Sequence, residues 1–204
     1  MEKTVRQYSK IYRKVLKEAG LDDSKQNISL YEKRLEEMYQ SDNFKKHNIY
    51  PSTNTTYIYA VIAMCVELKR HNLSDLQILD AVNKGFSARR NFSKRLIRII
   101  DKLPNSYEIA EKWNISDHAK REKDGSLTYE YFNVSNGKIE YKITKCMYAE
   151  MFETYGIRSF CKIFCMTDTM AYENLPAHVK FIRHSDLSDG DCCYDEIIKK
   201  EADN

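Results

Sequence analysis

Three cysteines and one aspartate in the last third of the chain occupy positions that suit chemistry. Cys146 follows a strand-like segment and begins a helix-like one, so its thiol lies where the helix dipole and backbone N–H groups favour the thiolate. Lys142 and Lys145 are close in sequence and favour the thiolate further. This arrangement suits a nucleophile. A small, inert core residue is the alternative role of such a cysteine.

The other candidates depend on which face of an element they occupy. Cys161 and Cys165 are four residues apart on a predicted helix and share a face. Asp168 follows Cys165 by three residues. This spacing either places a thiol and a carboxylate in one pocket or leaves an exposed aspartate near a buried cysteine, and the second alternative is favoured. Cys192 and Cys193 are adjacent on a predicted strand and point to opposite faces, so only one faces inward.

Metal or cofactor binding is the weaker interpretation. No Cys-x-x-Cys or zinc-ligand spacing occurs, and no Walker loop or Gly-x-Gly-x-x-Gly sequence is present. We therefore expect no metal and no cofactor. An irregular metal site would have to gather Cys146, Cys165, Cys193 and His178 or His184. Asp195 and Glu196 point opposite ways and do not form an evident acid/base pair. Polar surroundings indicate surface positions for His47, His71 and His118.

Residues 1–124 are predicted to form a helical region. Apolar spacings of three and four residues indicate helices over 4–18, 29–41, 55–70, 74–85 and 86–103. Ser74 and Gln77 have capping-box spacing, and Gly20 suits a helix end. The last helix is the most basic, and a solvated face is favoured over an anion-binding or partner-binding face. Its basic residues are Arg89, Arg90, Lys94, Arg95 and Arg98.

Strands are predicted to begin near residue 125. Asn136-Gly137 between two alternating segments is a strong hairpin signal. Two helices follow over 147–166, and then two strands over 178–183 and 192–198. The predicted fold is α+β, with a helical N-terminal half and a C-terminal antiparallel sheet of about four strands with helices on one face. We expect residues 1–124 and 125–204 to pack as one unit, with the candidate site in the second region.

The overall composition limits the classes of binding partner that we expect. The chain has 204 residues, 33 basic and 30 acidic, and this near balance favours neither nucleic acid nor a membrane as a partner. No membrane span or signal peptide is evident, so we expect a cytoplasmic protein with reduced thiols. The expected partner is a small-molecule substrate, and homo-oligomer formation stays open.

Three segments resemble one known family. They are residues 143–156, which contain Cys146 and Tyr148, residues 164–168, which contain Cys165 and Asp168, and residues 190–193, which end at Cys193. In this order they resemble the L-2-amino-thiazoline-4-carboxylic acid hydrolase-like family over roughly residues 128–199. The resemblance implies a hydrolase that acts on the carbon–nitrogen bonds of a cyclic amidine by adding water to the amidine carbon, which opens a small heterocycle and gives an N-carbamoyl amino acid.

The chemistry that the resemblance implies needs a nucleophile, a proton donor and a cation for the substrate carboxylate, and we assign these roles to residues that lie near one another in the sequence. Cys146 would be the nucleophile and Asp168 a proton shuttle or orienting group, with Cys193 as a further catalytic residue. The expected substrate-binding residues are Tyr148, Cys165, Arg158 and Arg183, and either arginine would pair with a substrate carboxylate. The alternatives are a non-catalytic small-molecule or metal-binding module, and an interaction protein that uses the basic helix 86–103.

Overall fold

The protein divides into two compact units. The structure, a computed structural model, describes residues 2–200, without the side chains of residues 2 and 88–90. One unit comprises the residues up to 88 together with 151–163, and the second comprises residues 89–150 together with those from 164 onward. The side chains of Arg89 and Arg90, two of the basic residues named for the helix predicted over 86–103, lie outside the described part of the structure. Helices α6 and α7 belong to the second unit, together with the sheet.

Helices make up the first unit. They are α1 (Glu2–Glu18), α2 (Lys25–Gln40), α3 (Asp42–Lys46), η1 (His47–Ile49), α4 (Ser52–Lys69), α5 (Asp75–Gly85) and η2 (Arg158–Cys161). The predicted capping box is confirmed, because Ser74 and Gln77 each accept a backbone hydrogen bond from the other. Gly20 has φ +68, which a glycine adopts at little cost after a helix. Helix α4 is buried on most sides.

One prediction for this unit is wrong. His47 was expected at the surface but is buried, with its Nδ1 2.7 Å from the hydroxyl oxygen of Tyr59. A buried imidazole needs a polar partner, and the hydroxyl of Tyr59 supplies it. Since Tyr59 lies twelve residues further along the chain, the polar sequence around His47 gave no sign of this contact.

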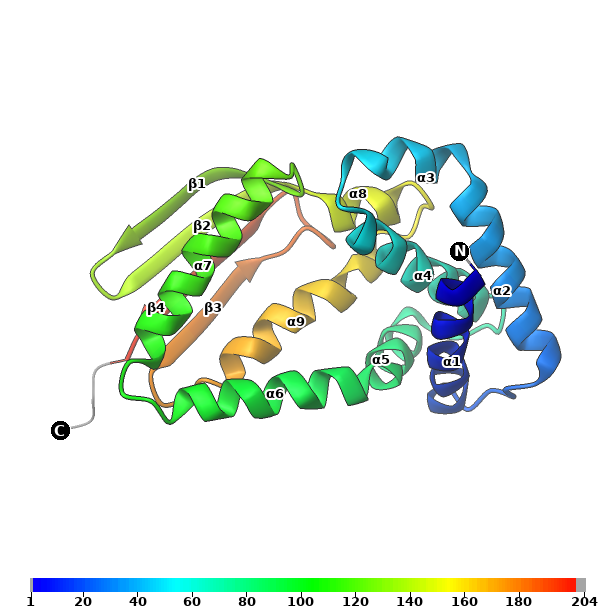
Figure 1. Cartoon of the computed structure of the whole chain (residues 1–204), viewed down its shortest axis with the longest axis horizontal. Coiled ribbons are helices and arrows are strands. Elements are labelled where there is room, and N and C mark those ends of the chain that lie inside the picture. The colour runs from blue at the N-terminus through cyan, green and yellow to red at the C-terminus, as the bar shows by residue number, and fades with distance from the viewer. Residues whose placement is uncertain (1, 201–204) are drawn as a thin grey trace. The chain divides into compact units, whose positions relative to one another are not determined.

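Four antiparallel strands and the helices beside them form the second unit (Figure 1). Its elements are α6 (Ser87–Asp101), α7 (Ser106–Lys123), β1 (Leu127–Ser135), β2 (Lys138–Cys146), the start of α8 (Met147–Glu153), most of α9 (Lys162–Glu173), β3 (Val179–Ser185) and β4 (Cys193–Lys199). The strand order is β1-β2-β4-β3. The predicted α+β fold, its hairpin and its four strands are confirmed.

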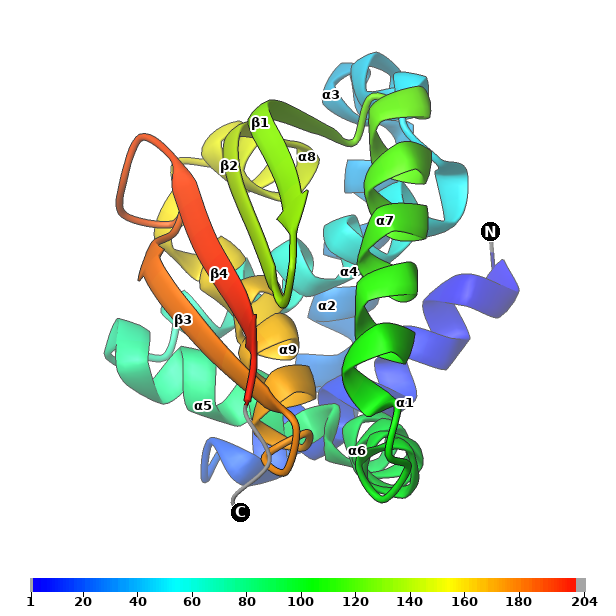
Figure 2. The ribbon, with the colours of Figure 1, turned by 90° about the vertical axis from the view of Figure 1, so that its left-hand side faces the viewer.

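The two faces of this sheet differ in chemistry. Tyr141 on β2 and Asp195 on β4 point to the inner face and are buried. On β3, Phe181 stacks on Tyr172 of α9 at 4.7 Å between ring centroids. The opposite face has ion pairs between strands, including Lys138 with Glu196. Figure 2 looks onto that opposite face, with α9 behind the sheet. The inner face is therefore where side chains from the sheet and the helices meet.

A bulge in β1 brings further aromatic rings to the inner face. The register with β2 shifts on both sides of Tyr129, so Tyr129 and Phe132 both contact Tyr141 although they are three residues apart. His118 of α7 lies 4.0 Å from Phe132 between ring centroids, which corrects the expected surface position of this histidine. Within residues 2–200, no helix has the length and apolar character needed to cross a membrane.

Candidate functional site

Asp195 lies at the centre of a hydrogen-bonded network on the inner face of the sheet. It is directly opposite Tyr141 on one neighbouring strand and Arg183 on the other. Arg183 donates to both carboxylate oxygens, from Nε to Oδ1 at 2.8 Å and from Nη2 to Oδ2 at 2.7 Å. Oδ2 also accepts from the Tyr141 hydroxyl at 2.9 Å and from the Cys193 thiol at 3.5 Å. We call these four residues the Asp195 network.

The charges in this network are matched although they are buried. Asp195 is only 1% exposed and the Arg183 side chain 16%, so neither charge is stabilised mainly by water. A two-pronged Arg–carboxylate pair is among the stronger charge-assisted hydrogen bonds. Burial, followed by the negative charge of Asp195, raises the pKa of the Cys193 thiol, which therefore stays protonated and donates. The bonds from Arg183, Tyr141 and Cys193 therefore hold the carboxylate of Asp195 in one position.

Arg183 also bonds the Asp195 network to helix α9. Its Nη1 donates to the backbone carbonyl of Cys165 at 2.7 Å, and its Nη2 lies 3.5 Å from Oδ2 of Asp168. Arg183, one of the two arginines predicted to bind a substrate carboxylate, is therefore bonded to protein groups on β4 and α9. Those bonds fix the part of α9 that carries Cys165 and Asp168 against strands β3 and β4.

Cys146 lies at the junction between β2 and α8, as predicted. The backbone N–H groups of Tyr148 and Ala149 bond to its sulfur and favour the thiolate. Burial outweighs them and raises the pKa of the thiol to about 12, and the nearby charges of Cys165 and Asp168 act in the same direction. Cys146, Cys165 and Asp168 are thus close enough to interact electrostatically, and we call them the thiol–carboxylate cluster.

Asp168 is the acid of this cluster. Its side chain is 57% exposed, yet the protein atoms around it raise the pKa of its carboxyl to about 6 by burial. Arg183 lowers the pKa and Asp195 raises it, but burial is the largest cause. Water at the exposed part of the side chain moderates the shift. A carboxyl that water reaches and whose pKa lies near neutral pH is suited to moving protons.

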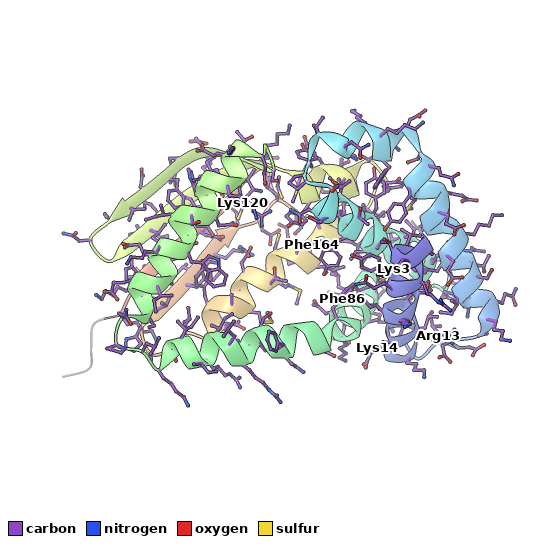
Figure 3. All side chains as sticks on the ribbon, in the orientation of Figure 1. Lys3, Arg13, Lys14, Phe86, Lys120 and Phe164 are labelled. Carbon is purple, nitrogen blue, oxygen red and sulfur yellow. The ribbon has the colours of Figure 1, made fainter. Side chains whose placement is uncertain are left out.

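An arginine from α7 completes the surroundings of the cluster. Arg121 is hydrogen-bonded to the hydroxyl of Tyr148 and lies 3.3 Å from both carboxylate oxygens of Asp117. Burial opposes its charge, but Tyr148 and Asp117 outweigh that effect and raise its pKa, so the guanidinium stays charged. The ring of Tyr148 packs on Phe164 at 4.5 Å between centroids; Phe164 is labelled in Figure 3.

The predicted site residues fall into two groups. Six of them lie in the second unit, on β2, α8, α9, β3 and β4, and they are Cys146, Tyr148, Cys165, Asp168, Arg183 and Cys193. Arg158 belongs to η2 of the first unit. All six cysteines of the chain are thiols. Among residues 2–200, with the side-chain gaps given above, no three His, Cys, Asp or Glu side chains are placed to hold a metal ion.

Sequence reasoning missed four residues of this region. Asp195 follows Cys193 by two residues and therefore shares its face, and this spacing is the signal that points to it. Arg121 and Asp117 have i, i+4 spacing, but the helix that carries them was not assigned. The fourth residue, Tyr141, was recognised only as an apolar position of its strand.

The family match covers this whole region. The family model described as L-2-amino-thiazoline-4-carboxylic acid hydrolase matches residues 53–195, which is more than half of the chain. The matched range ends at Asp195 and contains both the thiol–carboxylate cluster and the Asp195 network. No curated protein and no solved structure matches the chain. The extent of the match shows that the chain belongs to the L-2-amino-thiazoline-4-carboxylic acid hydrolase family.

Proposed function

We propose that the protein is a hydrolase that opens a small heterocyclic substrate, a cyclic amidine of the thiazoline kind, by cysteine-dependent addition of water. The family name supports the reaction class and the thiazoline carboxylate as a test substrate. The observation that carries the proposal is the thiol–carboxylate cluster, in which the charge of Asp168 acts on the thiol of Cys146. A nucleophile and a proton acceptor are the two groups that this chemistry needs first.

In the proposed first step the thiol adds to the ring. With a pKa of about 12, Cys146 is protonated at neutral pH, whereas Asp168, with a pKa of about 6, is mostly ionised. Asp168 takes the thiol proton as sulfur bonds to the amidine carbon, and the π electron pair of the carbon–nitrogen bond moves to nitrogen. The electron pair on nitrogen then re-forms the carbon–nitrogen double bond as the bond between that carbon and the ring sulfur breaks. The ring sulfur leaves with the proton held by Asp168, which opens the ring and leaves the substrate bound to Cys146.

The second step releases the product. Asp168 accepts a proton from water while the water oxygen bonds to the same carbon. The bond between that carbon and the Cys146 sulfur then breaks, and the proton returns to the thiol. One water molecule is consumed and the protein is regenerated. The hydroxyl of Tyr148, whose pKa burial raises to about 12, remains protonated and stabilises charge that develops on the substrate.

We assign the substrate carboxylate to Arg121 in preference to Arg183. Arg183 already binds both oxygens of the buried Asp195. The Nε of Arg121 lies 3.3 Å from each carboxylate oxygen of Asp117, which is longer than the bonds from Arg183 to Asp195. The side chain of Asp117 is also about half exposed, so water competes for it. A guanidinium with a weaker internal partner is better able to accept a second carboxylate. In this assignment the Asp195 network, including Cys193, positions α9 and does not touch the substrate.

One observation favours the alternative of a binding module without turnover. Burial keeps Cys146 protonated at neutral pH, so the thiol is inert unless Asp168 removes its proton. Tyr129 of β1, Tyr148 of α8 and Tyr172 of α9 lie close enough to Asp168 to interact with its charge, and tyrosine rings suit ligand binding as well as catalysis. The alternative predicts saturable binding of the thiazoline carboxylate without product.

The two functions are separated by kinetics with cysteine variants. Turnover of 2-aminothiazoline-4-carboxylate is followed by mass spectrometry for Cys146→Ala, Cys146→Ser and the matched control Cys192→Ala. Cys192 immediately precedes β4, and its thiol lies 3.6 Å from the Ser185 hydroxyl. The proposal predicts loss of product for both Cys146 variants and an unchanged rate for the control. Equal rates in all variants would remove Cys146 from the mechanism, and binding without product in the unmodified protein would favour the module.

A further inference from the structure

Helix α6 carries an exposed apolar stripe. Phe92 is 73% exposed, Leu96 53% and Ile99 61%, and Leu103, in the turn that follows the helix, is 41% exposed. We call these four residues the α6 stripe. Large apolar side chains that are exposed singly are ordinary, but four in one row mark an interaction surface.

The stripe lies away from the side on which α6 packs in its own unit. Ile97 is buried, the Nε of Arg98 donates to Oδ1 of Asn174 at 2.8 Å, and Oδ1 of Asp101 accepts from the backbone of Ala177 at 3.1 Å. At about 100° per residue, Ile97 and Asp101 are on the opposite side of the helix from the stripe. The packing of the second unit therefore does not account for the stripe.

The spacing of the stripe matches a helix partner better than a membrane. Its members are separated by four, three and four residues, which is the a/d spacing of a coiled coil. They fall within an arc of about 60°, narrower than the arc of about 100° or more that a helix usually buries against a core. A membrane would also take up a wide apolar face, whereas a narrow seam fits the side of one other helix.

The charges beside the stripe indicate the sign of that partner. Arg95 and Lys102 are exposed and lie along one edge of it, at the positions that flank a coiled-coil seam. In an antiparallel pair of two copies this basic edge would face itself. In a parallel pair it would face Ser93 and Ile100, so the described side chains that face this edge in a second copy offer no opposite charge in either orientation.

We propose that the α6 stripe is a docking surface for an amphipathic helix of an acidic partner protein. The partner helix has apolar residues at the same spacing and Asp or Glu beside them, opposite Arg95 and Lys102. Apolar burial along the seam supplies affinity, and the flanking charges select the partner and its register. This inference does not depend on the proposed hydrolase activity.

Two synthetic peptides test the proposal on the full chain. Both have three heptads with Leu at a and d, one with Glu and the other with Lys at the flanking e and g positions. Fluorescence anisotropy of labelled peptide is measured against the protein at low and high salt. We expect the Glu peptide to bind at least tenfold more tightly than the Lys peptide, and salt to reduce that difference. Equal affinities, or binding of neither peptide, would overturn the proposal.

Variants locate the binding on the stripe. Leu96→Glu with Ile99→Glu should abolish binding of the Glu peptide without lowering the Tm, because both side chains are exposed. Arg95→Glu with Lys102→Glu should reverse the preference toward the Lys peptide. Leu76→Glu, at an exposed apolar position of α5, is the matched control and should leave binding unchanged. Dimers that Leu96→Glu disrupts, or binding only to anionic vesicles, would assign the stripe to a second copy or a membrane and refute the acidic helix.

Discussion

The Arg183–Asp195 pair should be among the most sensitive points of the second unit. Arg183→Met keeps most of the side-chain volume but leaves the carboxylate of Asp195 buried without its cation. Removal of one partner from such a pair costs about 3–5 kcal/mol. Tyr141 and Cys193 still donate to Asp195, which favours the lower end of that range. We therefore expect a loss of about 3 kcal/mol in the free energy of unfolding, or roughly 6–12 °C in Tm at this chain length.

Trp113 provides the assay for this prediction. It is the only tryptophan of the chain and lies on α7, so its fluorescence during urea unfolding reports on the second unit. Lys142→Met removes an ion pair with Glu130 at the surface of the same sheet and serves as the control, with an expected cost below about 1 kcal/mol. The variant Arg183→Met with Asp195→Asn should recover part of the loss. If Arg183→Met costs no more than Lys142→Met, the interpretation of the Asp195 network is refuted.

Three further predictions concern pH, substrate binding and packing. Activity should rise with pH through about 6 as Asp168 ionises, and Asp168→Asn should remove that limb from the pH–rate profile. The raised pKa of Asp168 means that the folded protein holds this proton more tightly than the unfolded chain does. The contribution of Asp168 to the free energy of unfolding should therefore fall as pH rises from about 4 to about 6. Arg121→Gln should raise KM for the thiazoline carboxylate more than it lowers kcat, whereas equal KM values would exclude Arg121 as the carboxylate anchor. Gly85→Ala should cost about 1–3 kcal/mol in thermal unfolding of the first unit, because the added Cβ would overlap the side chain of Val15, and an unchanged Tm would contradict this packing.

Local patterns in the sequence were sufficient to predict most of the fold. The Asn136-Gly137 turn and the alternation on both sides of it identified β1 and β2, since hairpin geometry is set by neighbouring residues. The capping box at Ser74 placed the start of α5 for the same reason. Helix α7 was missed because its apolar residues are not confined to one stripe, and part of its packing depends on contacts of His118 with β1.

The candidate site was predictable only in part, because its contacts join residues far apart in sequence. Cys146 was recognised from its place at a strand–helix junction. The role of Asp195 depends on strand order, which brings it between Tyr141 and Arg183. No local pattern contains that order. The expectation that Arg183 binds substrate rests on its charge and its place in the sequence, which do not reveal its bonds to Asp195.

The central claim is that Cys146 forms a covalent bond with the substrate carbon during turnover. The most direct test is intact-protein mass spectrometry of the unmodified protein, mixed with excess 2-aminothiazoline-4-carboxylate and quenched with acid within the first turnover. Because the leaving atom stays attached to the opened ring, the account predicts a mass increase equal to the whole substrate, located on Cys146 by peptide mapping. Turnover with no such adduct on Cys146, or an adduct that persists in Cys146→Ala, would contradict it.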